Sequence, residues 1–120
     1  MTGGRPPGFG VEDFDLHGTS GVAVRGEVDV SVVPQLVHAL DAAIRDSWGA
    51  LVVDLRAADF LDSSGLGALL RARALLGRED RELVVVCPPG PVRRLFEVVG
   101  IDDLLIFYDS REDAAAALVP

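Results

Sequence analysis

The chain has 120 residues, 49% of them hydrophobic and 25% charged, which is the length and composition of one globular domain with a single core. Nineteen acidic against eleven basic side chains give a net charge of −8. Because this charge opposes the neutralisation of phosphates on which nucleic-acid binding depends, we expect no nucleic-acid partner.

The apolar runs are only a few residues long, far short of the roughly 20 that a membrane-spanning helix needs, and the first residues do not resemble a signal peptide. The single cysteine, Cys87, predicts neither a disulfide framework nor a metal cluster, and we expect it to be a small buried side chain. We therefore expect a cytoplasmic protein with no membrane insertion and no metal site.

The first predicted elements are two strands that follow a short tail. Residues 1–10 are rich in glycine and proline and have little to bury, so we predict a flexible tail before one domain over residues 11–120. Residues 11–16 and 22–28 have the pattern of strands. The turn-forming residues 17–21 between them predict an antiparallel hairpin with a five-residue loop.

A first helix is predicted after the Gly-Glu-Val-Asp sequence at residues 26–29. Ser31 is a suitable N-cap for it, and Pro34 falls in its first turn, where a missing backbone N–H costs little. Apolar residues at spacings of three and four mark one buried face: Val33, Leu36, Val37, Leu40 and Ile44. The helix ends near residues 46–49, where we expect Trp48 to cover the core.

Strands and helices alternate over the rest of the chain. Strands are predicted at residues 51–55, 83–87 and 104–108, and helices at 63–77, 91–99 and 111–118, the last capped by Ser110. Parallel neighbouring strands need a helix-length connection. The order therefore predicts an α/β fold: a mixed β-sheet with an N-terminal antiparallel hairpin, right-handed crossovers and helices packed on the sheet.

The turn before the second helix carries the residues that invite a functional interpretation. Asp62, Ser63 and Ser64 are all potential N-caps where one would suffice, and Gly65 and Gly67 each cost about 1 kcal/mol relative to alanine in a helix. Either the helix start packs tightly on its neighbours, or another molecule approaches Ser63 closely. A hydroxyl here is also suited to accept a phosphate, because backbone N–H groups and the helix dipole stabilise an anion.

A hydrolytic role for Ser63 would require a base within hydrogen-bond reach. The two histidines do not suggest one, since His17 falls in the predicted hairpin turn and His38 in the middle of a helix. The chain also has no Gly-x-Ser-x-Gly and no Gly-x-x-x-x-Gly-Lys-Ser/Thr sequence. We therefore predict a binding module that is not an enzyme and uses no cofactor.

The turn and two further stretches resemble a known family. Asp62-Ser63-Ser64-Gly65-Leu66-Gly67 resembles the signature of the STAS domain in bacterial anti-sigma factor antagonists, in which the serine directly after the aspartate is phosphorylated. Residues 26–29 are similar to the acidic turn before that family's first helix, and residues 91–101 are similar to its third helix. The resemblance covers nearly all of residues 11–118 and implies a single STAS-type domain.

The resemblance implies a partner-switching mechanism. The unphosphorylated antagonist binds an anti-sigma factor that is also a serine kinase, and so releases a sigma factor. Phosphorylation reverses this, and a serine phosphatase restores the binding form. By position, Ser63 would be the phosphoacceptor. The partner-binding residues implied are Glu27, Asp29, Asp62, Ser63, Ser64, Gly65, Leu66 and Gly67.

One departure from the family and two alternative functions remain open. Residues 32–33 are Val-Val where relatives commonly have Thr-Ala, which removes a hydroxyl near the expected partner surface and leaves the identity of the partner open. The first alternative is a stand-alone STAS subunit of a transport or lipid-trafficking complex that acts by binding only. The second is a small enzyme that uses Ser63.

Overall fold

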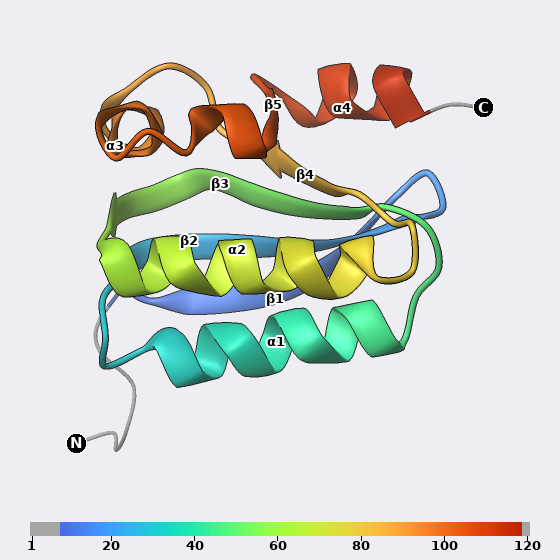
Figure 1. Ribbon diagram of the computed structural model, residues 1–120, viewed down its shortest axis with the longest axis horizontal. Coiled ribbons are helices and arrows are strands. Elements are labelled where there is room, and N and C mark those ends of the chain that lie inside the picture. The colour runs from blue at the N-terminus through green and yellow to red at the C-terminus, as the bar shows by residue number, and fades with distance from the viewer. Residues whose placement is uncertain (1–7, 119–120) are drawn as a thin grey trace.

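The structure, a computed structural model, describes residues 8–118. Strands and helices alternate after an initial pair of strands, as Figure 1 shows. The elements are β1 (Gly10–Leu16), β2 (Thr19–Val28), α1 (Val33–Arg45), β3 (Leu51–Leu61), α2 (Ser63–Gly77), β4 (Leu83–Val86), α3 (Pro91–Val98), the 3-10 turn η1 (Asp102–Leu104), β5 (Ile106–Tyr108) and α4 (Arg111–Leu118).

One mixed sheet of five strands, in the order β1-β2-β3-β4-β5, forms the centre of the molecule. β1 pairs with β2 antiparallel, and each later pair is parallel. The parallel pairs are those joined through a helix, as the geometry of a crossover requires. The predicted α/β fold with an N-terminal antiparallel hairpin is confirmed.

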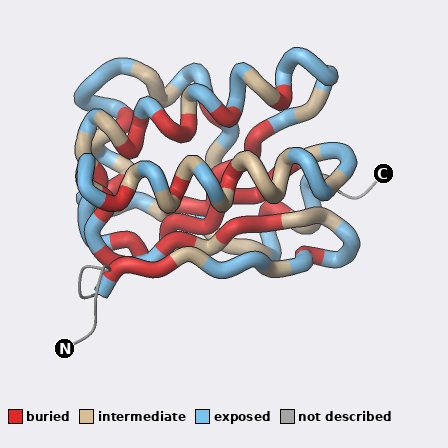
Figure 2. The backbone as a smooth tube through the Cα atoms, turned by 90° about the horizontal axis from the view of Figure 1, so that it is seen from below, coloured by how far each residue is buried: buried red, intermediate tan, exposed pale blue. Residues whose placement is uncertain are grey.

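Helices cover the two faces of the sheet unequally. The side chains of α1, α2 and α3 pack on one face and form the larger core, which includes Leu36, Leu69 and Phe96. Of the described helices only α4 packs on the other face, where Ala114 meets Val52 and Val84. Figure 2 shows that the buried stretches follow the strands and the parts of the helices that face them. Among the described residues, no helix is both long and apolar enough to cross a bilayer.

The hairpin between β1 and β2 is tighter than predicted. Pairing continues to Leu16 and Thr19, so the turn consists of His17 and Gly18 and not of five residues. Both have positive φ, 52° and 95°, which is the backbone that a two-residue turn needs to follow the twist of its strands. The carboxylate of Asp15 accepts a hydrogen bond from the Gly18 N–H at 3.1 Å. The prediction failed because a histidine is an unusual residue for a left-handed position.

The predicted tail is partly structured. Phe9 is 2% exposed and belongs to the main core, and Gly10 begins β1. Gly26 has a φ of 84°, and a Cβ there would lie 1.9 Å from the carbonyl oxygen of Gly8. A glycine is therefore needed for the chain before β1 to pass this point. The rest of the predicted tail, residues 1–7, lies outside the described residues.

After the hairpin, β3 and β5 differ most from their predicted lengths, and β4 ends one residue early. β3 continues past Leu55 to Leu61, because its second half pairs with β2 after β4 has ended. This pairing contains register shifts near Arg25 and Gly26, which hide the strand's alternation in the sequence. β5 is shorter than predicted, since Asp102–Leu104 form a 3-10 turn.

Two predictions around α1 were wrong. Ser31 is not its N-cap: the helix begins after Val32 with no side-chain cap, and the Ser31 hydroxyl donates instead to Asp29. Trp48 does not cover the core, because it is 92% exposed after the end of α1. Cys87 is buried as expected, and burial raises the pKa of its thiol to about 11.

Candidate functional site

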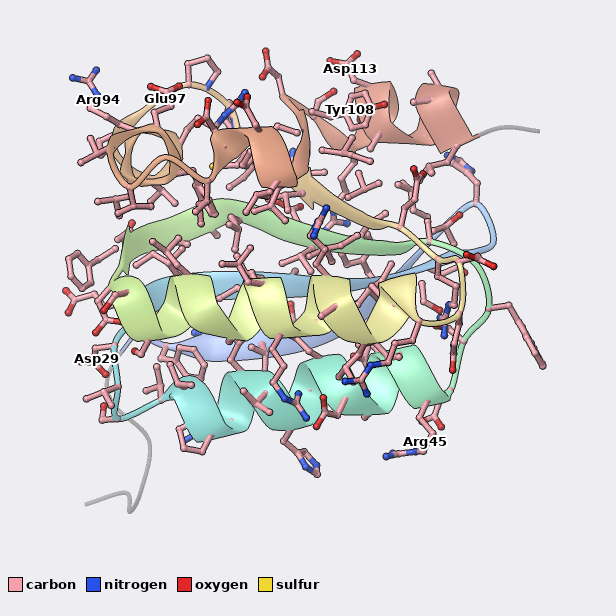
Figure 3. The ribbon with its side chains drawn as sticks, in the orientation of Figure 1. Asp29, Arg45, Arg94, Glu97, Tyr108 and Asp113 are labelled. Carbon is pink, nitrogen blue, oxygen red and sulfur yellow. The ribbon has the colours of Figure 1, made fainter. Side chains whose placement is uncertain are left out.

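The candidate site lies where β2 and β3 end. Because these strands are parallel, their carboxyl ends meet at the same edge of the sheet. Val28 pairs with Leu61, and the next N–H, from Asp62, donates to the Val28 carbonyl at 3.1 Å. The loop into α1 and the turn into α2 therefore lie side by side. In Figure 3 the labelled Asp29 stands beside the start of α2.

Asp62 is the N-cap of α2. Its Oδ1 accepts hydrogen bonds from the N–H groups of Ser64 at 3.0 Å and Gly65 at 3.2 Å, and from the Ser64 hydroxyl. The hydroxyl bond is the main reason why the pKa of Asp62 lies below its usual value; together with the N–H groups of Gly65, Ser64 and Val30 it outweighs the opposing effect of desolvation. The helix start therefore already holds one anion, the ionised carboxylate of Asp62.

The two serines are in different states. Ser63 is the first residue of α2 and is exposed, and its hydroxyl makes no hydrogen bond within residues 8–118. Ser64 is half-buried, and its hydroxyl donates to Asp62. A molecule arriving from solvent therefore meets a free hydroxyl on Ser63 and an occupied one on Ser64.

Gly65 and Gly67 have different structural roles. A Cβ on Gly65 would lie 2.7 Å from Cδ1 of Leu61 and 3.1 Å from Cγ1 of Val28, so this glycine lets the helix start pack on the ends of β2 and β3. Gly67 is exposed, and a Cβ there would meet nothing within 4 Å. Of the two explanations for the glycines, packing accounts for Gly65, whereas Gly67 leaves open surface one turn from Ser63.

Acidic and apolar side chains lie near the carboxyl ends of β2 and β3, at the same edge of the sheet as the serine. Glu27 is exposed at the end of β2, and Asp29 shapes the following loop by accepting bonds from the Ser31 N–H at 3.0 Å and its hydroxyl at 2.6 Å. Val30 and Phe60 are 73% and 47% exposed. Sequence reasoning missed both of these apolar residues. Phe60 had a signal, since it precedes the buried Leu61 and so points to the opposite side of the strand.

The predicted partner-binding residues are thus brought to one end of the molecule, but not all of them are at its surface. Glu27, Ser63 and Gly67 are exposed, and Asp29, Asp62 and Ser64 are half-buried. Gly65 is buried, and the side chain of Leu66 is 6% exposed in the main core. These last two residues position the turn.

Comparison with known proteins identifies the family. The model of the STAS domain matches residues 14–114. The chain belongs to the STAS domain family. It is 34% identical to the anti-sigma-B factor antagonist of Staphylococcus aureus strain NCTC 8325 over 91 residues, which cover 76% of this chain and 84% of that protein. It is 31% identical to the anti-sigma-B factor antagonist of Staphylococcus epidermidis over the same shares of both chains.

A solved relative has the same fold. The crystal structure of an anti-sigma factor antagonist from Mycobacterium paratuberculosis superposes with a TM-score of 0.85 at 35% identity, covering 95% of this chain and 97% of that chain. These named relatives are regulatory antagonists. The resemblance to STAS-domain anti-sigma factor antagonists, predicted from three short motifs, is confirmed.

Neither histidine of this STAS domain is placed to activate Ser63. His17 lies in the β1–β2 turn, at the other end of β2 from the serine. The 10 residues of β2 span about 30 Å at the usual rise of a strand. His38 is exposed on α1 and makes no hydrogen bond to Ser63. The described residues therefore supply no imidazole base for this hydroxyl.

Proposed function

We propose that this protein is an anti-sigma factor antagonist whose binding is switched off by phosphorylation of Ser63. In the unphosphorylated form it binds an anti-sigma factor with serine kinase activity, which then releases a sigma factor, and a serine phosphatase reverses the modification. The protein acts in the cytoplasm and has no catalytic activity of its own. The observation that carries the proposal is the contrast between the free, exposed hydroxyl of Ser63 and the engaged hydroxyl of Ser64.

The charges around Ser63 support this direction of switching. A neutral hydroxyl is buried in an interface at the cost of one hydrogen bond, whereas a phosphate carries about −1.5 to −2 charge. It would stand next to the ionised Asp62 and near Glu27 and Asp29. Even ~4 kcal/mol of repulsion and desolvation would weaken binding about a thousandfold.

The apolar surface supplies the attractive part of the contact. Val30 in the loop after β2 and Phe60 near the end of β3 are both exposed, and a partner would desolvate these branched and aromatic side chains. The open surface at Gly67 lets that partner approach the backbone of α2. The acidic residues Glu27, Asp29 and Asp62 require basic groups on the partner for electrostatic complementarity.

Phosphopeptide mapping and binding measurements test the proposal. The wild-type protein is incubated with candidate anti-sigma factor kinases and Mg-ATP, and the modified residue is identified by mass spectrometry. We expect phosphate on Ser63 in the wild type and in Ser64→Ala, and none in Ser63→Ala. By calorimetry, Ser63→Asp should bind the anti-sigma factor at least about a hundredfold more weakly than Ser63→Ala.

The matched control is Ser64→Ala, which removes a hydroxyl from the same turn but keeps both backbone bonds to Asp62. Phosphate on Ser64, or equally tight binding by Ser63→Asp and the wild type, would refute the switch. Co-purification with a transporter ATPase and with no anti-sigma factor would favour the transport alternative. Turnover of a substrate by the protein alone, lost in Ser63→Ala, would favour an enzyme.

A further inference from the structure

A second site stands on the opposite face of the sheet, away from Ser63. A cavity of about 360 Å³ lies over β1, β2 and β3 beside the start of α4, the helix that Asp113 marks in Figure 3. Its polar lining comes from Glu12, Arg25, Asp54, Arg56 and Arg111. The helices α1, α2 and α3 cover the other face, and α4 covers only part of this one.

Three guanidinium groups converge on this cavity from three elements. Arg25 belongs to β2, Arg56 to β3 and Arg111 to α4. This convergence is unusual in a chain with only eleven basic residues and a net charge of −8. Gly10 makes room for the first of them, since a Cβ there would lie 2.4 Å from Cζ of Arg25.

The buried Asp54 holds two of the three arginines in place. Arg56 donates from Nε at 3.1 Å and from Nη2 at 2.9 Å, and Arg111 donates from Nε at 2.7 Å. The guanidinium of Arg111 also lies 3.7 Å above the ring of Phe14. Both side chains are thus fixed before any ligand arrives, which lowers the entropic cost of binding.

The arginines keep donors that Asp54 does not use. Each guanidinium has five N–H groups. Within residues 8–118, Nη1 of Arg56 and both Nη groups of Arg111 have no hydrogen-bond partner. The side chains of Arg56 and Arg111 are 43% and 32% exposed, so these donors reach solvent.

We propose that this cavity binds the phosphate group of a small molecule. Donors from three directions suit a tetrahedral anion with several acceptor oxygens, whereas a planar carboxylate fits a single fork. The cavity lies at the small end of the range for ligand pockets, roughly 300–1,000 Å³, and admits a small phosphate ester or free phosphate. Glu12 in the lining and Glu112 near Arg56 oppose an anion, so we expect millimolar affinity.

Titration of the full-length ¹⁵N-labelled protein with inorganic phosphate tests this site. At constant ionic strength, we expect saturable shifts of the amides of Ala23, Arg56 and Arg111, and a smaller effect of sodium succinate. Glycerol phosphate in a parallel titration distinguishes a phosphate ester from the free ion as the tighter ligand. Because the site is separate from the proposed switch, Ser63→Ala should bind phosphate as the wild type does.

Arg25→Gln is the decisive variant, because it removes a donor from the cavity and leaves the pairs of Asp54 intact. We expect about tenfold weaker phosphate binding, the usual effect of losing one charge-assisted hydrogen bond. Arg45→Gln is the control, since Arg45 is the last residue of α1 and its side chain is 70% exposed, away from the cavity. An unchanged unfolding midpoint shows that Arg25→Gln is folded.

Three results would overturn the proposal. The first is shifts that do not saturate or that follow ionic strength alone. The second is shifts confined to the amides of Ser63, Ser64 and Gly65, which would assign the phosphate to the start of α2. The third is equal affinity of Arg25→Gln and the wild type, or tighter binding of succinate than of phosphate.

Discussion

Asp54 is the only charged side chain that is buried among the described residues, at 4% exposure. Burial is the largest influence on it and favours the neutral acid, but hydrogen bonds from Arg56 and Arg111 and the charge of Arg56 together outweigh burial and lower its pKa. The hydrogen bond to Asp54 is the main reason why the pKa of Arg56 is raised. The Asp54 carboxylate therefore links β3 to α4 through its ion pair with Arg111, on the face of the sheet that has the smaller apolar core.

The lowered pKa makes stability depend on pH in one direction. The group is ionised more readily in the folded state than in the unfolded chain, whose value is near 3.8. Its contribution is complete above that pH and is lost as the pH falls through the folded pKa. Asp62, whose pKa is also lowered, adds to the effect in the same range.

We expect Asp54→Asn to lower the free energy of unfolding at pH 7 by about 2 kcal/mol. The loss of one partner of a buried pair costs about 3–5 kcal/mol, and the value is reduced here because Arg56 is 43% exposed. Urea unfolding followed by circular dichroism measures it. The difference from wild type should shrink as the pH falls below the unfolded value of 3.8 and through the lowered pKa of Asp54. A constant difference across that range would contradict the electrostatic role. Asp59→Asn, at an exposed position of β3, is the control.

At the scale of elements, Gly65 and Gly67 in the first turns of α2 allow opposite predictions. Gly65→Ala should destabilise by about 1–2 kcal/mol, because its Cβ would lie 2.7 Å from Leu61 Cδ1 and the strain exceeds the gain in helix propensity. Gly67→Ala should stabilise by up to about 1 kcal/mol, since its Cβ meets nothing. Thermal unfolding of both variants measures the difference.

The same pair bears on the proposed docking surface. If a partner approaches α2 at Gly67, the more stable Gly67→Ala should bind the anti-sigma factor more weakly than wild type. An increase in stability with unchanged affinity would show that the partner does not use this surface. If Gly65→Ala were at least as stable as Gly67→Ala, that result would contradict the assignment of Gly65 to packing.

Helix bounds were predicted better than strand bounds because helix ends carry local signals. Residues 63–77 were predicted as a helix and α2 is Ser63–Gly77, and the Ser110 hydroxyl caps α4 by accepting from the Asp113 N–H at 3.0 Å. The end of β3 depends instead on pairing with β2 through two register shifts. Those long-range contacts leave no mark in a window of sequence.

Buried apolar surface is distributed unevenly over the domain, which predicts which element unfolds locally first. β3 is the central strand of the sheet and its residues 51–55 are all buried, whereas α4 has eight residues and buries only Ala114 fully. Elements with little buried apolar surface open by local unfolding. We expect native-state hydrogen exchange of the α4 amides to be at least about tenfold faster than that of Val52 and Val53. Equal rates would show that α4 opens only with the whole domain.

The sequence predicted where the candidate site lies but not which of its hydroxyl groups is free of hydrogen bonds. The motif located residues 62–67, and parallel strand order brought residues 26–29 beside them. The sequence could not show which serine has a free hydroxyl, because the Asp62 carboxylate can accept hydrogen bonds from backbone N–H groups at the helix start, from a serine hydroxyl, or from both. Asp54 was missed because a lone aspartate in the apolar run of residues 51–55 becomes informative only when Arg111, distant in sequence, is placed beside it.

The exposure of Trp48 determines how these experiments can be read. It is the only tryptophan of the chain, is 92% exposed, and lies after α1, at the end of β3 away from Ser63. Its emission in the native state should already have the wavelength of an indole in water, so unfolding will change its spectrum little. Conversely, a blue shift on adding a partner would report contact at this end of the domain.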